Sequence, residues 1–136
     1  MKINLRPYQT QLIADIYQAW QNGYKNVLAV SPTGSGKAFT LCTLAAQLAQ
    51  QGLPVPILVH RKELVTQLCM TLGQLGIKHN IIAQRDTILE VMDSQRKEYG
   101  QQFYDIKAPV TVCSVDTLLS RMDKYRDWLD AQKVWI

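Results

Sequence analysis

Three segments of the chain predict amphipathic helices, because their apolar residues recur every three or four positions. The segments cover residues 8–20, 39–49 and 64–75. Each is followed within a few positions by a glycine, the residue that most often ends a helix, at Gly23, Gly52 and Gly76. A further helix is predicted to start near Asp116, and a last short one includes Trp128 and Leu129.

Short apolar runs between these helices predict strands at 27–30, 55–60, 81–82, 110–113 and 133–136. The segment 85–107 is harder to assign, since residues 88–92 fit the start of a helix but 93–102 are mostly polar. Strands and helices therefore alternate along the chain. This order predicts an α/β fold in one domain, with a parallel sheet covered by helices on both faces.

The composition restricts the class of protein but does not indicate a function. The chain has 136 residues, 47% of them hydrophobic and 19% charged, and a formal charge of +4, which permits a polyanionic partner without requiring one. No apolar run approaches the length needed to cross a bilayer. The three widely spaced cysteines have no metal-ligand spacing and indicate reduced core residues, so we expect a cytoplasmic protein with no membrane segment.

The segment between the first predicted strand and the second helix carries the strongest chemical signal. Residues 31–38 read SPTGSGKA, close to the phosphate-binding P-loop, in which glycines let backbone N–H groups surround a phosphate and a lysine adds charge. The motif ends in Ser or Thr, whose hydroxyl holds Mg²⁺, but this chain has Ala38 there. The alternative is an ordinary Gly/Ser turn with a solvated lysine, which the strand before and the helix after it disfavour.

Three further segments accompany this loop in a fixed order. They read LRPYQ at 5–9, HRKELVTQ at 60–67 and TVCSVDTL at 111–118. Together with PTGSGK at 32–37 they closely resemble the ordered N-terminal motifs of superfamily 2 helicases. The nearest branch is similar to DEAD/DEAH-type enzymes related to the type III restriction helicase subunit. The resemblance implies a RecA-like P-loop NTPase domain that uses ATP and Mg²⁺.

The resemblance also implies roles for individual residues at the nucleotide. Lys37 would be the catalytic residue of the loop, and Gln9 would contact the adenine edge, in a pocket shaped by Arg6 and Tyr8. The phosphates would be bound by the loop residues Thr33, Gly34, Ser35, Gly36 and Lys37, followed by Ala38, which leaves no metal ligand in the predicted site. Without the family pattern, Gln9 reads equally well as a solvated residue of a first helical turn.

The remaining motifs would contact nucleic acid, most readily DNA. The resemblance implies that Arg61 follows the second strand and that Ser114 and Thr117 lie at the end of the fourth, each contacting the phosphate backbone. Phosphate contacts carry no base identity, so such binding would be largely independent of sequence. The alternatives are a charged helix start around Arg61 and plain helix capping by the two hydroxyl residues.

Two departures from the family pattern leave the function open. Ala38 lacks the magnesium ligand, and residues 133–136 match a strand that in the family runs into an Asp-Glu pair. We therefore expect the N-terminal portion, 1–136, of a first RecA-like motor domain, incomplete at its C-terminus, from an ATP-dependent helicase or translocase. This segment alone would be inactive, with an exposed sheet edge that favours self-association. The alternatives are a catalytically dead nucleotide- or nucleic-acid-binding module and, less favoured, another P-loop ATPase.

Overall fold

The structure is a computed structural model that describes residues 5–29, 36–132 and 135–136. Within these residues, a three-stranded parallel sheet forms the centre of the molecule. The strands β1 (Val55–Val59), β2 (Asn80–Ile82) and β3 (Val110–Ser114) lie in the order β1–β3–β2. Val55 lies opposite Val110, and Asn80 opposite Thr111. The first four residues of β3 are all buried, as expected of a central strand covered on both faces.

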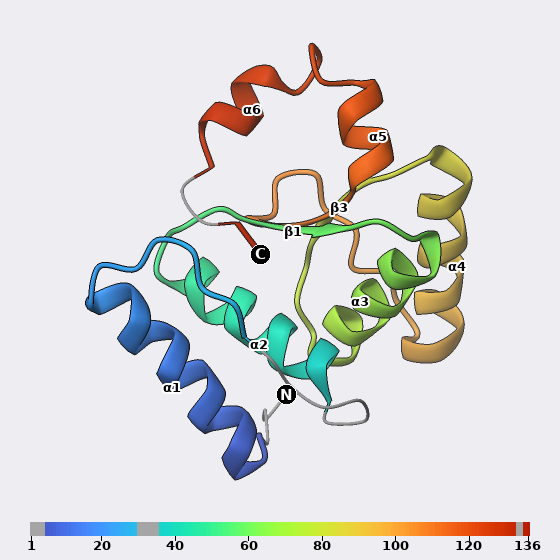
Figure 1. Ribbon diagram of the computed structural model, residues 1–136. Helices are drawn as coiled ribbons and strands as arrows, with labels where there is room; N and C mark the ends of the chain where they lie inside the picture. Colours follow the sequence, from blue (N-terminus) through green and yellow to red (C-terminus); the bar gives the residue numbers. More distant parts are fainter. Residues whose placement is uncertain (1–4, 30–35, 133–134) are drawn as a thin grey trace.

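Helices cover both faces of this sheet, which confirms the predicted α/β architecture (Figure 1). They are α1 (Pro7–Gln21), α2 (Lys37–Gln50), α3 (Lys62–Gln74), α4 (Arg85–Tyr99), α5 (Val115–Ser120) and α6 (Arg126–Asp130). The larger core joins one sheet face to α2 and α3, with α1 packed on α2 and α4 on α3. A smaller cluster of Ile82, Cys113 and Leu118 lies on the other face, against side chains of the α6 region. None of the helices among the described residues is long and apolar enough to span a bilayer.

The predicted strand at 27–30 is not formed in its described part. Residues 27–29 have no strand assignment, and Leu28 is 89% exposed, whereas the sequence predicted a buried strand; Val30 lies outside the described residues. A strand needs a neighbour to receive its backbone hydrogen bonds. Within the described part of the chain, the sheet consists of β1, β3 and β2 alone, and none of these pairs with residues 27–29.

The segment that the sequence left unassigned contains a complete helix. The helix α4 runs from Arg85 to Tyr99 and ends at Gly100, whose φ of 77° is the left-handed conformation that favours glycine. Most of its polar residues 93–99 lie on an exposed face of the helix. Val91 and Gln95 are buried, on the face that packs against α3. The sequence prediction failed here because one of the buried residues is a glutamine.

The last predicted strand, 133–136, is described only at Trp135 and Ile136. Neither residue is assigned to a strand, yet the backbone of Ile136 hydrogen-bonds β1 on both sides of Ile57. Its N–H donates to Pro56 O at 3.0 Å, and its carbonyl accepts from Leu58 N at 2.8 Å. This is the hydrogen-bond pattern of a parallel neighbour. Ile136 therefore lies along the edge of β1 that β3 leaves open.

Candidate functional site

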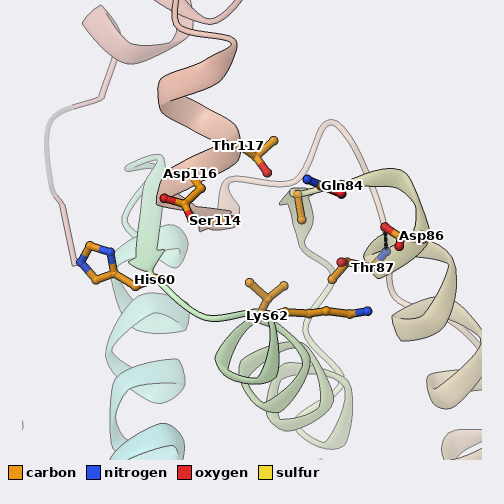
Figure 2. Close-up of a pocket in the computed structure, with 10 residues that line it drawn as sticks. His60, Lys62, Gln84, Asp86, Thr87, Ser114, Asp116 and Thr117 are labelled. Carbon is orange, nitrogen blue, oxygen red and sulfur yellow. Dashed lines mark hydrogen bonds between the residues drawn. The ribbon is translucent and has the colours of Figure 1, made fainter.

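A cavity of about 270 Å³ lies where the three strands end (Figure 2). Parallel strands bring their carboxyl ends to one sheet edge, which is where open α/β sheets bind ligands. Segments after each strand supply the lining, which consists of His60, Lys62, Val65, Ala83, Gln84, Asp86, Thr87, Ser114, Asp116 and Thr117. The cavity thus joins the two motifs that the sequence analysis assigned to nucleic acid, although they lie about fifty residues apart along the chain.

Ser114 and Thr117 reach this cavity from the end of β3 and the first turn of α5. Ser114 occupies the N-cap position, but its side chain makes no capping hydrogen bond. The simple capping interpretation is therefore not supported for Ser114. Thr117 is only 5% exposed, and its backbone carbonyl accepts a hydrogen bond from Ser120 Oγ at 3.0 Å. Both hydroxyl residues thus belong to one wall of the cavity.

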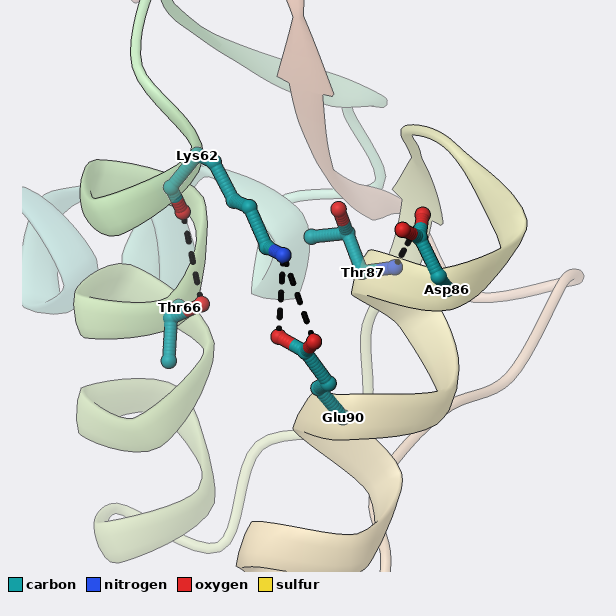
Figure 3. Close-up of polar contacts among 5 residues, drawn as sticks. All are labelled: Lys62, Thr66, Asp86, Thr87 and Glu90. Atoms are coloured by element: carbon teal, nitrogen blue, oxygen red, sulfur yellow. Dashed lines mark hydrogen bonds and ion pairs between the residues drawn. The ribbon is translucent and has the colours of Figure 1, made fainter.

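Lys62 is the cation of the cavity lining, and it is already paired (Figure 3). Its Nζ lies 3.1 Å from Glu90 Oε2 and donates to Glu90 Oε1 at 3.2 Å, which joins the first turn of α3 to α4. The hydrogen bond and the charge of Glu90 raise the pKa of Lys62. Asp86 and Asp116 also line the cavity, so its charge is mixed rather than uniformly positive.

Arg61 lies at the edge of the sheet where the strands end, but it does not line the cavity. It is the N-cap residue of α3, with extended backbone and an exposed side chain. Its neighbours His60 and Lys62 line the cavity instead. Sequence reasoning treated Lys62 as part of a charged helix start, and no signal in the sequence distinguishes which of these consecutive residues turns inward.

The described part of the predicted nucleotide site begins at Gly36. Thr33, Gly34 and Ser35 lie outside the described residues, together with the rest of 30–35. Gly36 precedes α2 with a φ of 77°, the left-handed conformation expected for a glycine in such a loop. Lys37 is the first residue of α2 and is exposed. An exposed lysine at a helix N-terminus fits the triphosphate of a nucleotide.

The predicted adenine-contacting residues lie beside this glycine. Gln9 is 4% exposed, and its Nε2 donates to the Gly36 carbonyl at 3.2 Å, while its Oε1 accepts from Arg6 N at 2.9 Å. Arg6 Nη1 donates to Tyr8 Oη at 3.1 Å, and both side chains are exposed. The structure therefore brings Arg6, Tyr8 and Gln9 together with the end of the loop. A contact of Gln9 with adenine stays a prediction.

Ala38 and the described residues beside it supply no side-chain ligand for a directly bound Mg²⁺. Ala38 has no oxygen and packs partly buried against the core. The nearest hydroxyl along the helix, Thr40 Oγ1, donates to the Gly36 carbonyl at 3.1 Å and is buried. Among the described residues, no cluster of three or more His, Cys, Asp or Glu side chains is able to hold a metal ion.

Comparison with known families gives the arrangement its context. The family described as "Type III restriction enzyme, res subunit" matches residues 2–136, nearly the whole chain. The chain belongs to this family. The membership confirms the resemblance to superfamily 2 helicases, on which the site residues were chosen.

Relatives in this group are much longer than the chain. It is 28% identical to UvrABC system protein B of a Synechococcus strain over 123 residues, which cover 90% of this chain and 15% of that protein. The corresponding protein of Syntrophotalea carbinolica is 26% identical over 136 residues, covering 98% of this chain and 18% of the relative. The chain thus spans less than a fifth of the relatives it matches.

A solved structure confirms the fold alone. A nuclease-deletion mutant of the Type ISP restriction-modification enzyme LlaGI, solved with a DNA substrate mimic, superimposes with a TM-score of 0.61 at 15% identity. The match covers 91% of this chain and 14% of that one.

Proposed function

We propose that this chain is the N-terminal portion of the first RecA-like motor domain of an ATP-dependent helicase or translocase acting on DNA. ATP would bind through the loop that ends at Gly36 and Lys37, and the DNA backbone would bind at the cavity. The observation that carries the proposal is the meeting of both nucleic-acid motifs in one cavity at the carboxyl edge of the sheet. Family membership supports the same activity, as do relatives that are named as UvrABC system proteins.

Nucleotide binding is tested by titration with a fluorescent ATP analogue. Lys37→Ala removes a positive charge from the first residue of α2, and we expect it to abolish detectable binding. Lys78→Ala is the matched control, because Lys78 is also exposed but lies outside the helix termini and the cavity. Unchanged affinity in Lys37→Ala would refute the nucleotide assignment.

DNA binding is tested by fluorescence anisotropy with a short labelled oligonucleotide. Ser114→Ala combined with Thr117→Val removes two cavity hydroxyls while keeping side-chain size close to the original. We expect the double variant to weaken binding by the same factor for unrelated DNA sequences, because backbone contacts carry no base identity. Equal affinity of the double variant and the unchanged chain would place the DNA elsewhere.

A second candidate function, a nucleotide-binding module without turnover, is favoured by Ala38. Thr40 Oγ1, the next hydroxyl along the helix, donates to the Gly36 carbonyl and so does not replace the missing magnesium ligand. We expect Ala38→Thr in the full-length protein to raise the DNA-stimulated ATPase rate by roughly tenfold or more, because a metal ligand stabilises transition-state charge. Equal rates that both exceed the rate without protein would mean that the hydroxyl is dispensable and would favour the enzyme, whereas no hydrolysis by either version would favour the module without turnover.

The proposal also includes the cellular location of the protein. A cytoplasmic location agrees with Cys42, Cys69 and Cys113, which are free and buried. Burial raises the pKa of Cys42 and Cys113 to about 12, so these thiols stay protonated and unreactive in the folded chain.

We also propose that the chain self-associates through the exposed apolar segment at 27–29.

A further inference from the structure

A second cavity, of about 770 Å³, lies at the other end of β1 from the cavity described above. Leu53, two residues before β1 begins, lines this second cavity, whereas His60, just after β1, lines the first. The length of β1, roughly 17 Å for a strand of this size, therefore separates them. Among the described residues, the two cavities share no lining residue.

Aromatic side chains dominate the lining of this second cavity, which we call the aromatic cavity. Four of its ten lining residues are aromatic, although aromatic residues make up only 8% of the chain. They are Tyr17 and Trp20 of α1, Tyr24 shortly after that helix, and Trp135. Tyr24 is 65% exposed and Trp135 is 41% exposed, so ring surface is available to a ligand.

Contacts within the protein hold three of these rings in place. Tyr17 and Trp20 meet edge to face, with ring centroids 5.6 Å apart and planes at 88°. Tyr17 Oη also accepts a hydrogen bond from Gln51 Nε2 at 3.3 Å, which joins α1 to the residue after α2. Trp135 meets Trp128 edge to face, with centroids 6.2 Å apart. Binding a planar group beside these rings therefore costs little side-chain freedom.

Lys25 supplies the charge of the aromatic cavity. Its side chain is exposed, and it is the only charged residue among the described residues of the lining. Within the described part of the chain it forms no ion pair, unlike Lys62 in the other cavity. One cation beside aromatic rings suits a base and its single backbone phosphate, because bases stack on such rings and the ammonium group attracts the phosphate. A free nucleoside triphosphate fits less well, since one lysine balances only part of its charge.

We propose that the aromatic cavity is a separate nucleic-acid subsite, which binds an unpaired base of a single strand by stacking. The inference goes beyond the proposed function, because it uses none of the residues assigned to the nucleotide or to the DNA backbone. A duplex keeps its base faces stacked inside and offers none to these rings. Every base has a π face, so the subsite accepts any sequence.

Fluorescence anisotropy with a short labelled strand of thymidine nucleotides tests the inference. Tyr24→Leu removes the most exposed ring of the aromatic cavity, and we expect it to weaken binding roughly three- to tenfold. Tyr24→Phe keeps the ring and should bind as tightly as the unchanged chain. Lys25→Gln should also weaken binding at low salt, whereas Lys78→Gln should not, because Lys78 is exposed but lies outside both cavities.

A strand of the same length without bases separates stacking from charge. We expect this abasic strand to bind the unchanged chain more weakly than the thymidine strand does, and to bind Tyr24→Leu no more weakly than it binds the unchanged chain. An equal loss for both strands, or a loss for neither, would overturn the inference. A lower mass of Tyr24→Leu in light scattering, with unchanged affinity for the thymidine strand, would also overturn it, because a second copy of the chain would then cover the cavity.

The same comparison in the Ser114→Ala, Thr117→Val background keeps the inference distinct from the proposed function. We expect Tyr24→Leu to weaken binding of the thymidine strand by a similar factor in this background, since the cavities share no described lining residue. Loss of that factor would overturn the inference of a separate subsite. Unchanged affinity of the double variant itself would count against the proposed backbone site alone.

Discussion

The ion pair of Lys62 and Glu90 sets how much positive charge the cavity offers to a phosphate. Both side chains are about half exposed, and exposed ion pairs contribute little to stability, so Lys62 readily exchanges Glu90 for another anion. We predict that Glu90→Gln raises the affinity for short DNA roughly two- to fivefold at low salt, since it removes the competing carboxylate. Fluorescence anisotropy over a salt series measures the change, which should diminish as salt rises.

Asp93→Asn provides the matched control on the same helix. Asp93 pairs with Lys97 at 2.9 Å and lies outside the cavity, so this variant changes the net charge equally without releasing Lys62. We expect it to leave affinity nearly unchanged. An equal gain in both variants would show that total charge, not the release of Lys62, controls binding.

His79 makes the stability of the fold depend on pH. It is fully buried, its Nδ1 lies 2.9 Å from Ile77 O, and its Nε2 lies 3.4 Å from Gln95 Nε2, an arrangement suited to the neutral ring. Burial lowers the pKa of His79, with the Ile77 hydrogen bond partly opposing the shift. Below the unfolded-state pKa of about 6.5, the unfolded chain therefore binds more protons than the folded chain.

We predict that the free energy of unfolding is level with respect to this residue above about pH 6.5 and falls as the pH drops below that value. Urea denaturation at several pH values between about 5 and 7.5 measures the slope. Replacing His79 with Gln should flatten it, whereas His60→Gln should not, because His60 is exposed. A slope that persists unchanged in His79→Gln would assign the pH dependence to other groups.

At the scale of elements, α3 and α4 are in close contact at Gly73. A Cβ added there would lie 3.0 and 3.1 Å from ring atoms of Tyr99, whose hydroxyl donates to Met70 O at 2.8 Å and so holds the ring in place. In an open helix interior, Gly→Ala stabilises by up to about 1 kcal/mol. Here we predict that Gly73→Ala destabilises by about 1 kcal/mol, since overpacking outweighs helix propensity.

Thermal or urea unfolding of a double-mutant cycle checks this prediction. In a Tyr99→Ala background the obstructing ring is gone and only Gln95 Nε2, at 3.3 Å from the added Cβ, stays close, so Gly73→Ala should become clearly less destabilising. If Gly73→Ala destabilises equally in both backgrounds, the cause is not the contact with Tyr99.

The same two helices show where sequence reasoning succeeded and failed. The spacing of Leu64, Leu68 and Leu72 predicted α3, because leucines four positions apart form a stripe along one face of an amphipathic helix. The helix α4 was only half recognised, because Gln95 is fully buried yet polar. Its amide donates to Cys69 O at 2.8 Å and accepts from Phe103 N at 2.8 Å, both bonds to residues outside its own helix. A pattern of hydrophobic residues does not predict the burial of a polar side chain whose hydrogen-bond partners lie in other elements.

At the scale of the whole molecule, the parallel sheet determines which motifs meet. Because the strands are parallel, the segments after 55–60 and 110–113 lie at one edge of the sheet, and residues of both line the cavity. Order along the chain was not enough to predict that Lys62 rather than Arg61 lines the cavity, since that depends on the rotation of α3. The strand expected at 27–30 was also wrong in its described part, because an apolar run becomes a strand only when a neighbour pairs with it.

The segment at 27–29, which pairs with no strand among the described residues, leads to a prediction about association. Leu28 is 89% exposed, Tyr24 is 65% exposed, and residues 27–29 pair with no strand of the described sheet. Apolar side chains next to unpaired backbone favour strand pairing with a second copy of the chain. We predict that the average mass measured by light scattering rises with concentration, and that Leu28→Lys reduces the rise. Leu89→Lys should not, because Leu89 is 53% exposed but lies within the hydrogen-bonded helix α4. A mass that stays monomeric at every concentration would show that the segment is satisfied within a single molecule.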